Sequence, residues 1–105
     1  MIIVTKDNFN SEIELSDKLC IIDLYADWCG PCRALAPILA ALEEENPEVK
    51  FCKINVDDEP ELARAFGVSS IPMVAAVKKN TFLDASVGVV PKAALKKLID
   101  DNKDF

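Results

Sequence analysis

Two hydrophobic patterns alternate along the chain. Continuous apolar runs, such as LCIIDLYA at 19–26, are typical of strands that are covered on both faces. Apolar residues at i, i+3, i+4 and i+7, as at Leu35, Ile38, Leu39 and Leu42, are typical of an amphipathic helix. These patterns predict strands over 2–5, 19–26, 49–56, 73–77 and 81–87, and helices over 7–16, 32–45, 57–66 and 91–102.

The predicted elements follow the order β-α-β-α-β-α-β-β-α. The first three strands are joined by helices and should therefore run parallel, because a parallel connection needs a long crossover. The strands at 73–77 and 81–87 flank a short turn at 78–80 and should form an antiparallel hairpin. We therefore predict an α/β fold over residues 1–105, a single domain in which helices cover both faces of one mixed five-stranded sheet.

Individual residues add detail to this pattern. Either Asp7 or Asn8 is expected to cap the first helix, and Pro37 should kink the second, because its ring removes a backbone donor. Gly67 should end the third helix, and Asn80 is expected to take a left-handed turn position. The last helix, which starts with a proline, is expected to bury Ala94, Leu95, Leu98 and Ile99.

Composition narrows the class of protein. Half of the 105 residues are apolar and 29% are charged, as in ordinary globular domains, and the net charge is −6. No block of lysine and arginine is present, so a nucleic-acid partner is not expected. No segment approaches the roughly 18 apolar residues of a membrane span, and MIIVTKDNFN does not resemble a secretory leader. We therefore expect a cytoplasmic protein, in a compartment where static disulfides are rare.

The stretch ADWCGPCRA, residues 26–34, carries the candidate chemistry. Cys29 follows a buried strand and stands where the next helix begins, and unpaired backbone N–H groups at that point lower the pKa of a thiol. A thiolate is the species that attacks a disulfide. Gly30 and Pro31 allow a tight turn, and Cys32 lies one turn into the helix, where we expect it to be less exposed than Cys29.

A pair spaced as CxxC can also bind a metal or form a static disulfide. A structural zinc site uses four ligands, whereas this chain has no histidine, and its other cysteines, Cys20 and Cys52, are isolated on predicted strands. We expect those two to be buried and reduced. A disulfide that closes so small a ring removes little entropy from the unfolded chain. The residues therefore favour redox chemistry over a metal site or a structural disulfide.

With these motifs the chain resembles the thioredoxin family over essentially its whole length. The resemblance implies the thioredoxin fold, and CxxC near a βαβ pattern is the general signature of that redox class. It rests on WCGPC at 28–32, IDLYA before it, AP at 36–37, KINVDDEP at 53–60, GVSSIP at 67–72, VG at 87–88 and the closing LKKLI.

The resemblance also implies roles for residues of the redox centre. Cys29 would be the nucleophile and Cys32 the resolving thiol, and Pro31 would keep the pair reducing. Asp23, in an apolar strand, matches the family's buried acid, which accepts a proton from the resolving cysteine and whose pKa burial should raise. Lys53 matches a lysine close to that acid. The alternatives are an Asp23 satisfied by local backbone donors and a Lys53 that is simply exposed on its strand.

Further matches imply a substrate-binding surface. Pro72 corresponds to a cis-proline that faces the cysteines, and a cis bond would turn the Ile71 backbone outward, where an extended client segment can pair with it. Trp28, Val87 and Gly88 match the apolar rim of the family's active site, although Trp28 can also be a partly buried packing residue.

Three features depart from the family pattern. Met73 stands where the family commonly has threonine, and Ser69–Ser70 replace a stretch that more often holds glycine or a basic residue. Both changes are expected to bear on partner choice. Asn80 stands where glycine is frequent, which should affect local stability alone.

The resulting prediction is a thiol–disulfide oxidoreductase that reduces protein disulfides through Cys29 and Cys32 as an electron carrier. No Gly-rich dinucleotide fingerprint is present, so we expect no cofactor, and a thioredoxin reductase or an equivalent donor would restore the dithiol. The other expected partners are disulfide-containing clients, and the protein is expected to be a monomer. An oxidase or isomerase, and a binding module in which the dithiol is incidental, remain as alternatives.

Overall fold

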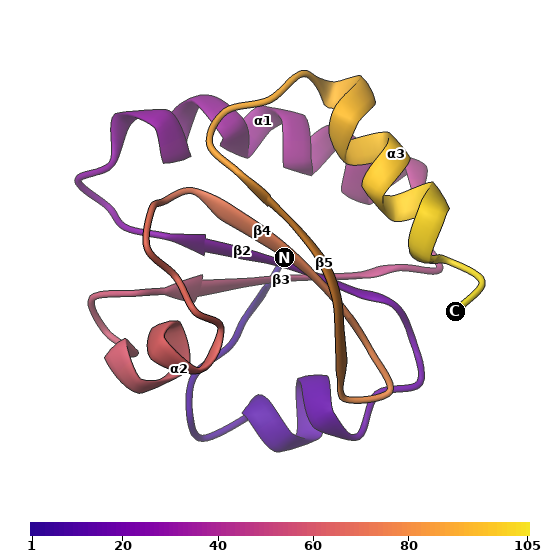
Figure 1. Cartoon of the computed structure of the whole chain (residues 1–105), viewed down its shortest axis with the longest axis horizontal. Coiled ribbons are helices and arrows are strands. Elements are labelled where there is room, and N and C mark those ends of the chain that lie inside the picture. Colours follow the sequence, from indigo (N-terminus) through magenta and orange to yellow (C-terminus); the bar gives the residue numbers. More distant parts are fainter.

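A twisted five-stranded sheet crosses the centre of the molecule in the computed structural model, which describes all 105 residues (Figure 1). The strands lie in the order β1-β3-β2-β4-β5. β1, β3 and β2 run parallel, whereas β4 is antiparallel to β2 and to β5, so the predicted mixed sheet is confirmed. The strands are β1 (Ile2–Ile3), β2 (Cys20–Tyr25), β3 (Lys50–Asn55), β4 (Met73–Lys78) and β5 (Thr81–Val87).

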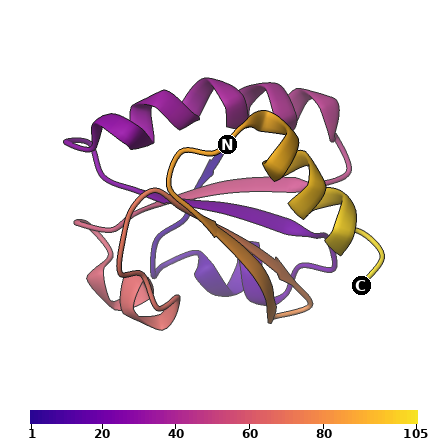
Figure 2. The same ribbon diagram turned by 45° about the horizontal axis from the view of Figure 1, so that its top comes forward.

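Helices cover both faces of this sheet, as predicted. Figure 2 shows α1 (Gly30–Glu45) and α3 (Lys92–Asn102) above the sheet, with η1 (Asn10–Glu14) and α2 (Pro60–Ala65) below it. Pro37 lies inside α1, which continues past it to Glu45, and the kink there stays a prediction. No helix is long and apolar enough to cross a membrane.

The sheet divides the interior into two apolar layers. Because successive side chains of a strand point to opposite faces, Ile21 packs with Leu39 of α1, and Ile22 packs with Ile13 of η1. The first layer contains 12 buried residues and the second contains 10. The continuous apolar run at 19–26 therefore reflects burial on both faces of β2.

Cys20 and Cys52 lie in the second of these layers. Both are free thiols with at most 1% of their surface exposed. Ile22 of β2 is the direct partner of Cys52 on β3, which puts Cys20 one pleat away on the same face of the sheet. The expectation that both cysteines are buried and reduced is confirmed.

The N-terminal helix differs from the one predicted over 7–16. It is a single π-helical turn, Asn10–Glu14, closed by a hydrogen bond from the Leu15 N–H to the Asn10 carbonyl (2.9 Å). Neither Asp7 nor Asn8 caps it. The Asn8 side chain instead accepts from the Thr5 N–H (2.7 Å) and donates to the Ile3 carbonyl (2.9 Å), so its local bonds stabilise a turn in competition with the helix.

Other boundaries shift for local reasons. α1 begins at Gly30 rather than at residue 32, because Cys29 forms its N-cap. α2 begins only at Pro60 rather than at residue 57, since the Asn55 side chain accepts from the N–H groups of Asp57 and Asp58 and holds them in a turn.

The predicted turn positions are confirmed, whereas the predicted buried face of the last helix is only partly right. Gly67 follows α2 with a φ of 70°, as its predicted role as a helix stop requires. Asn80 has a φ of 58°, which confirms its left-handed position, and Lys79 shares that conformation with a φ of 52°. Ala94 is exposed, so its predicted burial is wrong, whereas Leu95, Leu98 and Ile99 are buried. The sheet covers only a narrow stripe of α3, and Ala94 falls outside it.

Candidate active site

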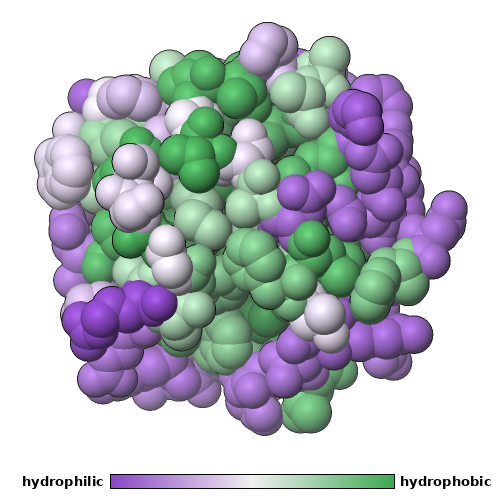
Figure 3. Space-filling view, viewed as in Figure 1, coloured by the Kyte–Doolittle hydropathy of each residue, from purple (hydrophilic) through white to green (hydrophobic).

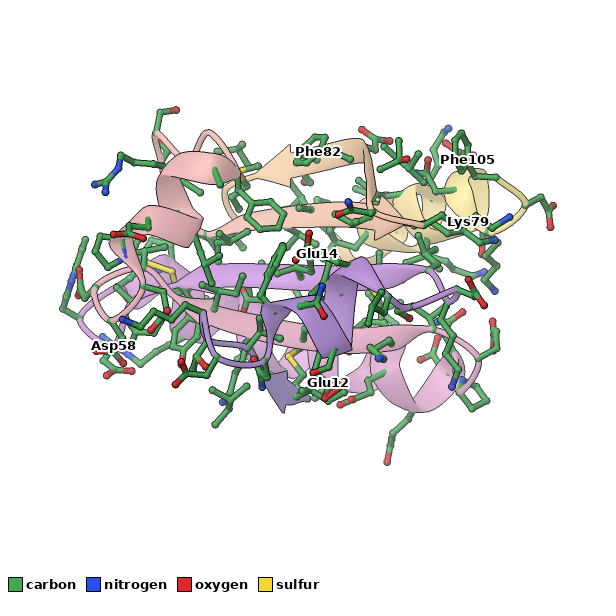
Figure 4. The ribbon with its side chains drawn as sticks, turned by 90° about the horizontal axis from the view of Figure 1, so that it is seen from below. Glu12, Glu14, Asp58, Lys79, Phe82 and Phe105 are labelled. Carbon is green, nitrogen blue, oxygen red and sulfur yellow. A yellow bond between two sulfur atoms is a disulfide. The ribbon has the colours of Figure 1, made fainter.

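The CGPC segment lies where β2 gives way to α1, at the left of Figure 1. Cys29 and Cys32 form a disulfide, with their Cα atoms 5.3 Å apart. Figure 4 shows this disulfide as a yellow bond at the same end of the molecule as Asp58. The carboxyl ends of β2 and β3 meet at this edge, so residues from several segments converge on the sulfur atoms.

Cys29 is the N-cap of α1. Its Sγ accepts a hydrogen bond from the Cys32 N–H (3.2 Å), and its carbonyl accepts from the Arg33 N–H (3.2 Å). The helix dipole and this N–H donor both favour negative charge on the Cys29 sulfur once the disulfide is reduced. Pro31 occupies the first turn, where a missing backbone donor costs nothing.

The two cysteines do not differ in exposure. Each has 4% of its surface exposed, so the prediction that Cys32 is the less exposed partner is wrong for the disulfide-bonded pair. The small ring folds both sulfur atoms beneath the loop and against Ile71. Their surroundings differ instead: Cys29 Sγ lies 4.0 Å from the Ile71 carbonyl oxygen, whereas Cys32 lines a cleft that it shares with Asp23.

A cis peptide bond joins Ile71 to the buried Pro72, as the family resemblance implied. The Pro72 carbonyl accepts from the Gly88 N–H (2.8 Å), which ties this loop to the end of β5. The N–H and C=O groups of Ile71 take part in no backbone hydrogen bond. A strand-like edge with free donor and acceptor groups therefore lies beside the disulfide.

An apolar surface surrounds this edge. Trp28 is 69% exposed and Val87 is 55% exposed, so both side chains present apolar surface to solvent, and a rim role and partial packing remain compatible for Trp28. Figure 3 shows that apolar residues gather over β4 and β5 on the face seen in Figure 1, in contrast to the hydrophilic surface of α3. Among its exposed members, Val87 pairs with Met73 beside the Ile71–Pro72 loop, whereas Phe82 pairs with Val77 farther along the hairpin.

Asp57 is a site residue that the sequence analysis missed. Its carboxylate accepts a hydrogen bond from Trp28 Nε1 (2.8 Å) and so fixes the orientation of an otherwise exposed ring. The two residues stand 29 positions apart, and no local pattern links them. The one available signal was the acidic run DDE at 57–59, because it follows a strand whose end we expected at the same edge of the sheet as the end of the strand before Trp28.

Asp23 lies on β2 behind the disulfide, with 7% of its surface exposed. Its Oδ1 atom has no hydrogen-bond partner, so the alternative of a carboxyl group satisfied by local backbone donors is wrong for that oxygen. Burial raises the pKa of Asp23 to about 6, against the opposing attraction of Lys53. A carboxyl group in this state can exchange a proton close to neutral pH.

Lys53 stands directly across from Asp23 on β3. It is half-buried rather than exposed on its strand, and its ammonium group lies 5.7 Å from the centre of the Tyr25 ring. Both charged residues line a cleft of about 380 Å³. The cleft is lined by Met1, Asp23, Tyr25, Ala26, Asp27, Cys32, Arg33, Ala36, Ala40, Glu43 and Lys53.

Comparison with known proteins identifies the family to which this chain is similar. The family model described as Thioredoxin matches residues 1–101. Thioredoxin from Chlamydia caviae is 42% identical over 100 residues, which is 95% of this chain and 96% of the relative. Thioredoxin from Chlamydia muridarum is 42% identical over 101 residues, 96% of this chain and 97% of the relative. Putative thioredoxin 2 from Streptomyces coelicolor is 38% identical over 96 residues, 91% of this chain and 71% of the relative.

Proposed function

Because the chain belongs to the thioredoxin family and is a thiol–disulfide oxidoreductase, we propose that it reduces protein disulfides with Cys29 as the attacking thiol. The observation that carries this proposal is the position of Cys29. Its sulfur accepts an N–H donor at the start of α1 and lies 4.0 Å from the free Ile71 edge. A nucleophile with this support next to a docking edge fits attack on a client disulfide.

The proposed reaction has two exchange steps. The Cys29 thiolate attacks one sulfur of the client disulfide, which forms a mixed disulfide and releases the other client sulfur as a thiolate. The Cys32 thiolate then attacks the Cys29 sulfur, which re-forms the Cys29–Cys32 disulfide and releases the second client thiolate. Two electrons pass to the client, and its two sulfurs take up one proton that came from Cys32 and one from solvent.

Asp23 is the proposed acceptor of the Cys32 proton. It shares a cleft with Cys32, and one of its oxygens is unpartnered. With its pKa raised to about 6 by burial, Asp23 is mainly ionised at neutral pH and is a stronger base than an ordinary carboxylate. Lys53 is the proposed modulator of this acid, since its positive charge opposes the effect of burial.

Client binding is proposed at the edge beside the disulfide. The free N–H and C=O groups of Ile71 can pair with an extended client backbone, as a sheet edge pairs with an added strand. Trp28, Val87 and Gly88 would contact the client side chains, and Pro72 would hold Ile71 in place. Gly30 and Pro31 shape the turn that joins the two cysteines.

The partners follow from this reaction. The family implies disulfide-containing clients and a thioredoxin reductase in general, and we propose that a separate reductase restores the dithiol of this chain after each turnover. We also propose that the chain works as one domain, as a monomer and in the cytoplasm. The single sheet and the family match over residues 1–101 support the one-domain assignment.

Insulin reduction with a dithiol donor tests the assignment of the nucleophile. Cys29→Ser should lose at least about 10³-fold in rate, because Cys29 is the thiol whose sulfur accepts an N–H donor and lies 4.0 Å from the Ile71 carbonyl oxygen. Cys20→Ser, a change in a buried thiol of the other layer, is the matched control and should keep the parent rate. Equal rates for Cys29→Ser and the parent would contradict the proposal and would favour the binding-module alternative.

Two further measurements separate reductant from oxidant and name the clients. Equilibration with glutathione should give a reducing potential, and a value near −120 mV, typical of disulfide oxidases, would contradict the reductant assignment.

Cys32→Ser should trap clients as stable mixed disulfides on Cys29, since the resolving thiol is absent. Mass spectrometry of the trapped complexes would identify the clients.

A further inference from the structure

Tyr25, Asp23 and Lys53 share one face of the sheet. Asp23 and Tyr25 stand two residues apart on β2, so their side chains point to the same side. Lys53 on β3 is the direct partner of Asp23, and neighbouring parallel strands keep paired side chains on one face. All three residues line the cleft that Cys32 also lines.

Two groups near Lys53 could interact with its positive charge, the Asp23 carboxylate and the Tyr25 ring. Lys53 forms no ion pair with Asp23 or with any other carboxylate. Its ammonium group instead lies over the Tyr25 ring, 5.7 Å from the ring centre, within the range of a cation–π contact. The Asp23 Oδ1 atom is correspondingly left without a partner. The ring therefore competes directly with the carboxylate for the ammonium group.

This arrangement matters because the placement of Lys53 sets the proton affinity of Asp23. In a direct ion pair the ammonium group would hold Asp23 as a poorly basic carboxylate. If the ammonium group lay in bulk water, solvent would screen its charge from Asp23, and burial alone would set the proton affinity of Asp23. A cation held over the ring gives an intermediate state, in which the carboxylate is attracted to Lys53 and its Oδ1 atom is still free.

Most of the other charged groups around the cleft have partners of their own. Arg33 Nη1 donates to the Asp27 carbonyl oxygen (2.7 Å), and Glu43 forms an ion pair with the N-terminal ammonium group (3.3 Å). Asp27 is exposed. Lys53 is the one cation whose charge lowers the pKa of Asp23. A change in the placement of Lys53 therefore has no second cation to compensate for it.

We propose that Tyr25 is a positioning residue whose ring holds the Lys53 ammonium group within electrostatic reach of Asp23 but out of a direct ion pair with it. This proposal rests on the proposed role of Asp23 as the proton acceptor for Cys32. Tyr25 touches neither client nor proton in this scheme and acts through Lys53. Its ring, rather than its hydroxyl group, is the part that is required.

A double-mutant cycle read by NMR tests the proposal. The Asp23 carboxyl ¹³C signal is followed from pH 4 to 9 in the disulfide form, so that neither Cys29 nor Cys32 titrates. In the Tyr25 background, Lys53→Met should lower the acid dissociation constant of Asp23 about tenfold, because it removes the attracting charge. In a Tyr25→Leu background the same change should have less than about a threefold effect, because Lys53 no longer has a fixed place near Asp23.

Tyr25→Phe is the matched control, because it keeps the ring and removes only the hydroxyl group. The effect of Lys53→Met should return to about tenfold in that background. An equal effect of Lys53→Met with Leu or with Phe at position 25 would overturn the proposal. Tyr25→Met serves as a second ring-free variant in case the leucine variant does not fold, and it should reproduce the loss of coupling.

Failure of this proposal can be told apart from failure of the proposed function. The NMR titration reads Asp23 directly and does not depend on reduction of any client. Asp23→Asn tests the proton-acceptor role separately, through the pH dependence of the insulin reduction rate. If Tyr25 acts as proposed, Tyr25→Leu should also shift that pH dependence while Tyr25→Phe leaves it unchanged, and a rate loss with no change in pH dependence would mark a merely structural role.

Discussion

The molecule contains two pairs of buried sulfur atoms that differ in bonding state and in surroundings. Cys29 and Cys32 are 4% exposed and form a disulfide at the start of α1. Cys20 and Cys52 are at most 1% exposed and remain thiols in the layer beneath the sheet. Burial by itself therefore does not decide which cysteine does chemistry.

The surroundings of each pair explain the difference. An N–H group donates to the Cys29 sulfur, and a backbone edge lies beside it. Burial among apolar side chains raises the pKa of Cys20 and raises that of Cys52 to about 12. The thiolate is the reactive form, so the sheet pair is held inert while the helix start favours reaction. The feature that separates the two pairs is therefore the helix start and the backbone edge beside Cys29 rather than the degree of burial.

The largest expected effect separates the two pairs by reaction rate. After reduction of the disulfide, iodoacetamide at pH 7.5 should label Cys29 on the order of 10²–10³ times faster than Cys20 or Cys52. Peptide mass spectrometry over a time course measures each rate. In denaturant, where burial and the helix are lost, the rates should converge to within about fivefold. A sheet cysteine that reacts as fast as Cys29 in the folded protein would break the comparison.

A second expected effect concerns the carboxyl group behind the active pair. The pKa of Asp23 is about 6 in the folded protein, against an ordinary value of 3.8, so folding favours its protonated form. The stability that this provides is complete below pH 4 and is lost as the pH rises through 6. Asp23→Leu should therefore raise the free energy of unfolding by ~2–3 kcal/mol at pH 7.5 and by much less at pH 4.

Urea unfolding at the two pH values measures this difference. Asp17→Leu, which places the same substitution at an exposed position, is the control for the change of residue itself. A stability gain for Asp23→Leu that is equal at both pH values would show that better apolar packing, rather than the charge, caused it. Asp23 is the one carboxyl group that is buried, so no such pH effect is expected from the apolar layer around Cys52.

The smallest expected effect comes from the inert pair. Cys52→Ala removes a sulfur atom from a packed layer and should cost about 1–2 kcal/mol in the free energy of unfolding. The rate of insulin reduction, measured at a temperature where the variant is folded, should stay within about twofold of the parent. A large loss of activity with a small loss of stability would give Cys52 a part in the chemistry and would blur the contrast between the pairs.

Much of the fold was predictable because its signals are local. The continuous apolar run at 19–26 indicates a strand that is buried on both faces. The spacing of Leu35, Leu39 and Leu42 indicates the helix face that packs on the sheet. The predictions failed where a neighbouring side chain decided the outcome. Asn8 bonds to Thr5 and Ile3 instead of capping a helix, and Ala94 lies outside the covered stripe of α3.

The candidate site was predictable in its residues but less so in its geometry. CGPC identified Cys29 and Cys32, and the apolar run around Asp23 marked that acid as out of place. The link from Trp28 to Asp57 and the position of Lys53 over Tyr25 each join separate segments, and no spacing in the chain reports them. The functional roles of Asp23, Lys53 and the rim residues stay predictions.

The amino-acid sequence by itself determined the order of the elements, the redox pair and its place at a helix start. Those features depend on periodicity and on backbone groups within a few residues, which act in any context. Only the tertiary structure decided that both active-site cysteines are equally enclosed, that Ile71 leaves a free edge beside them, and that Asp23 has an unpartnered oxygen. These properties depend on which distant segments pack together and exclude water, and that packing exists only in the assembled fold.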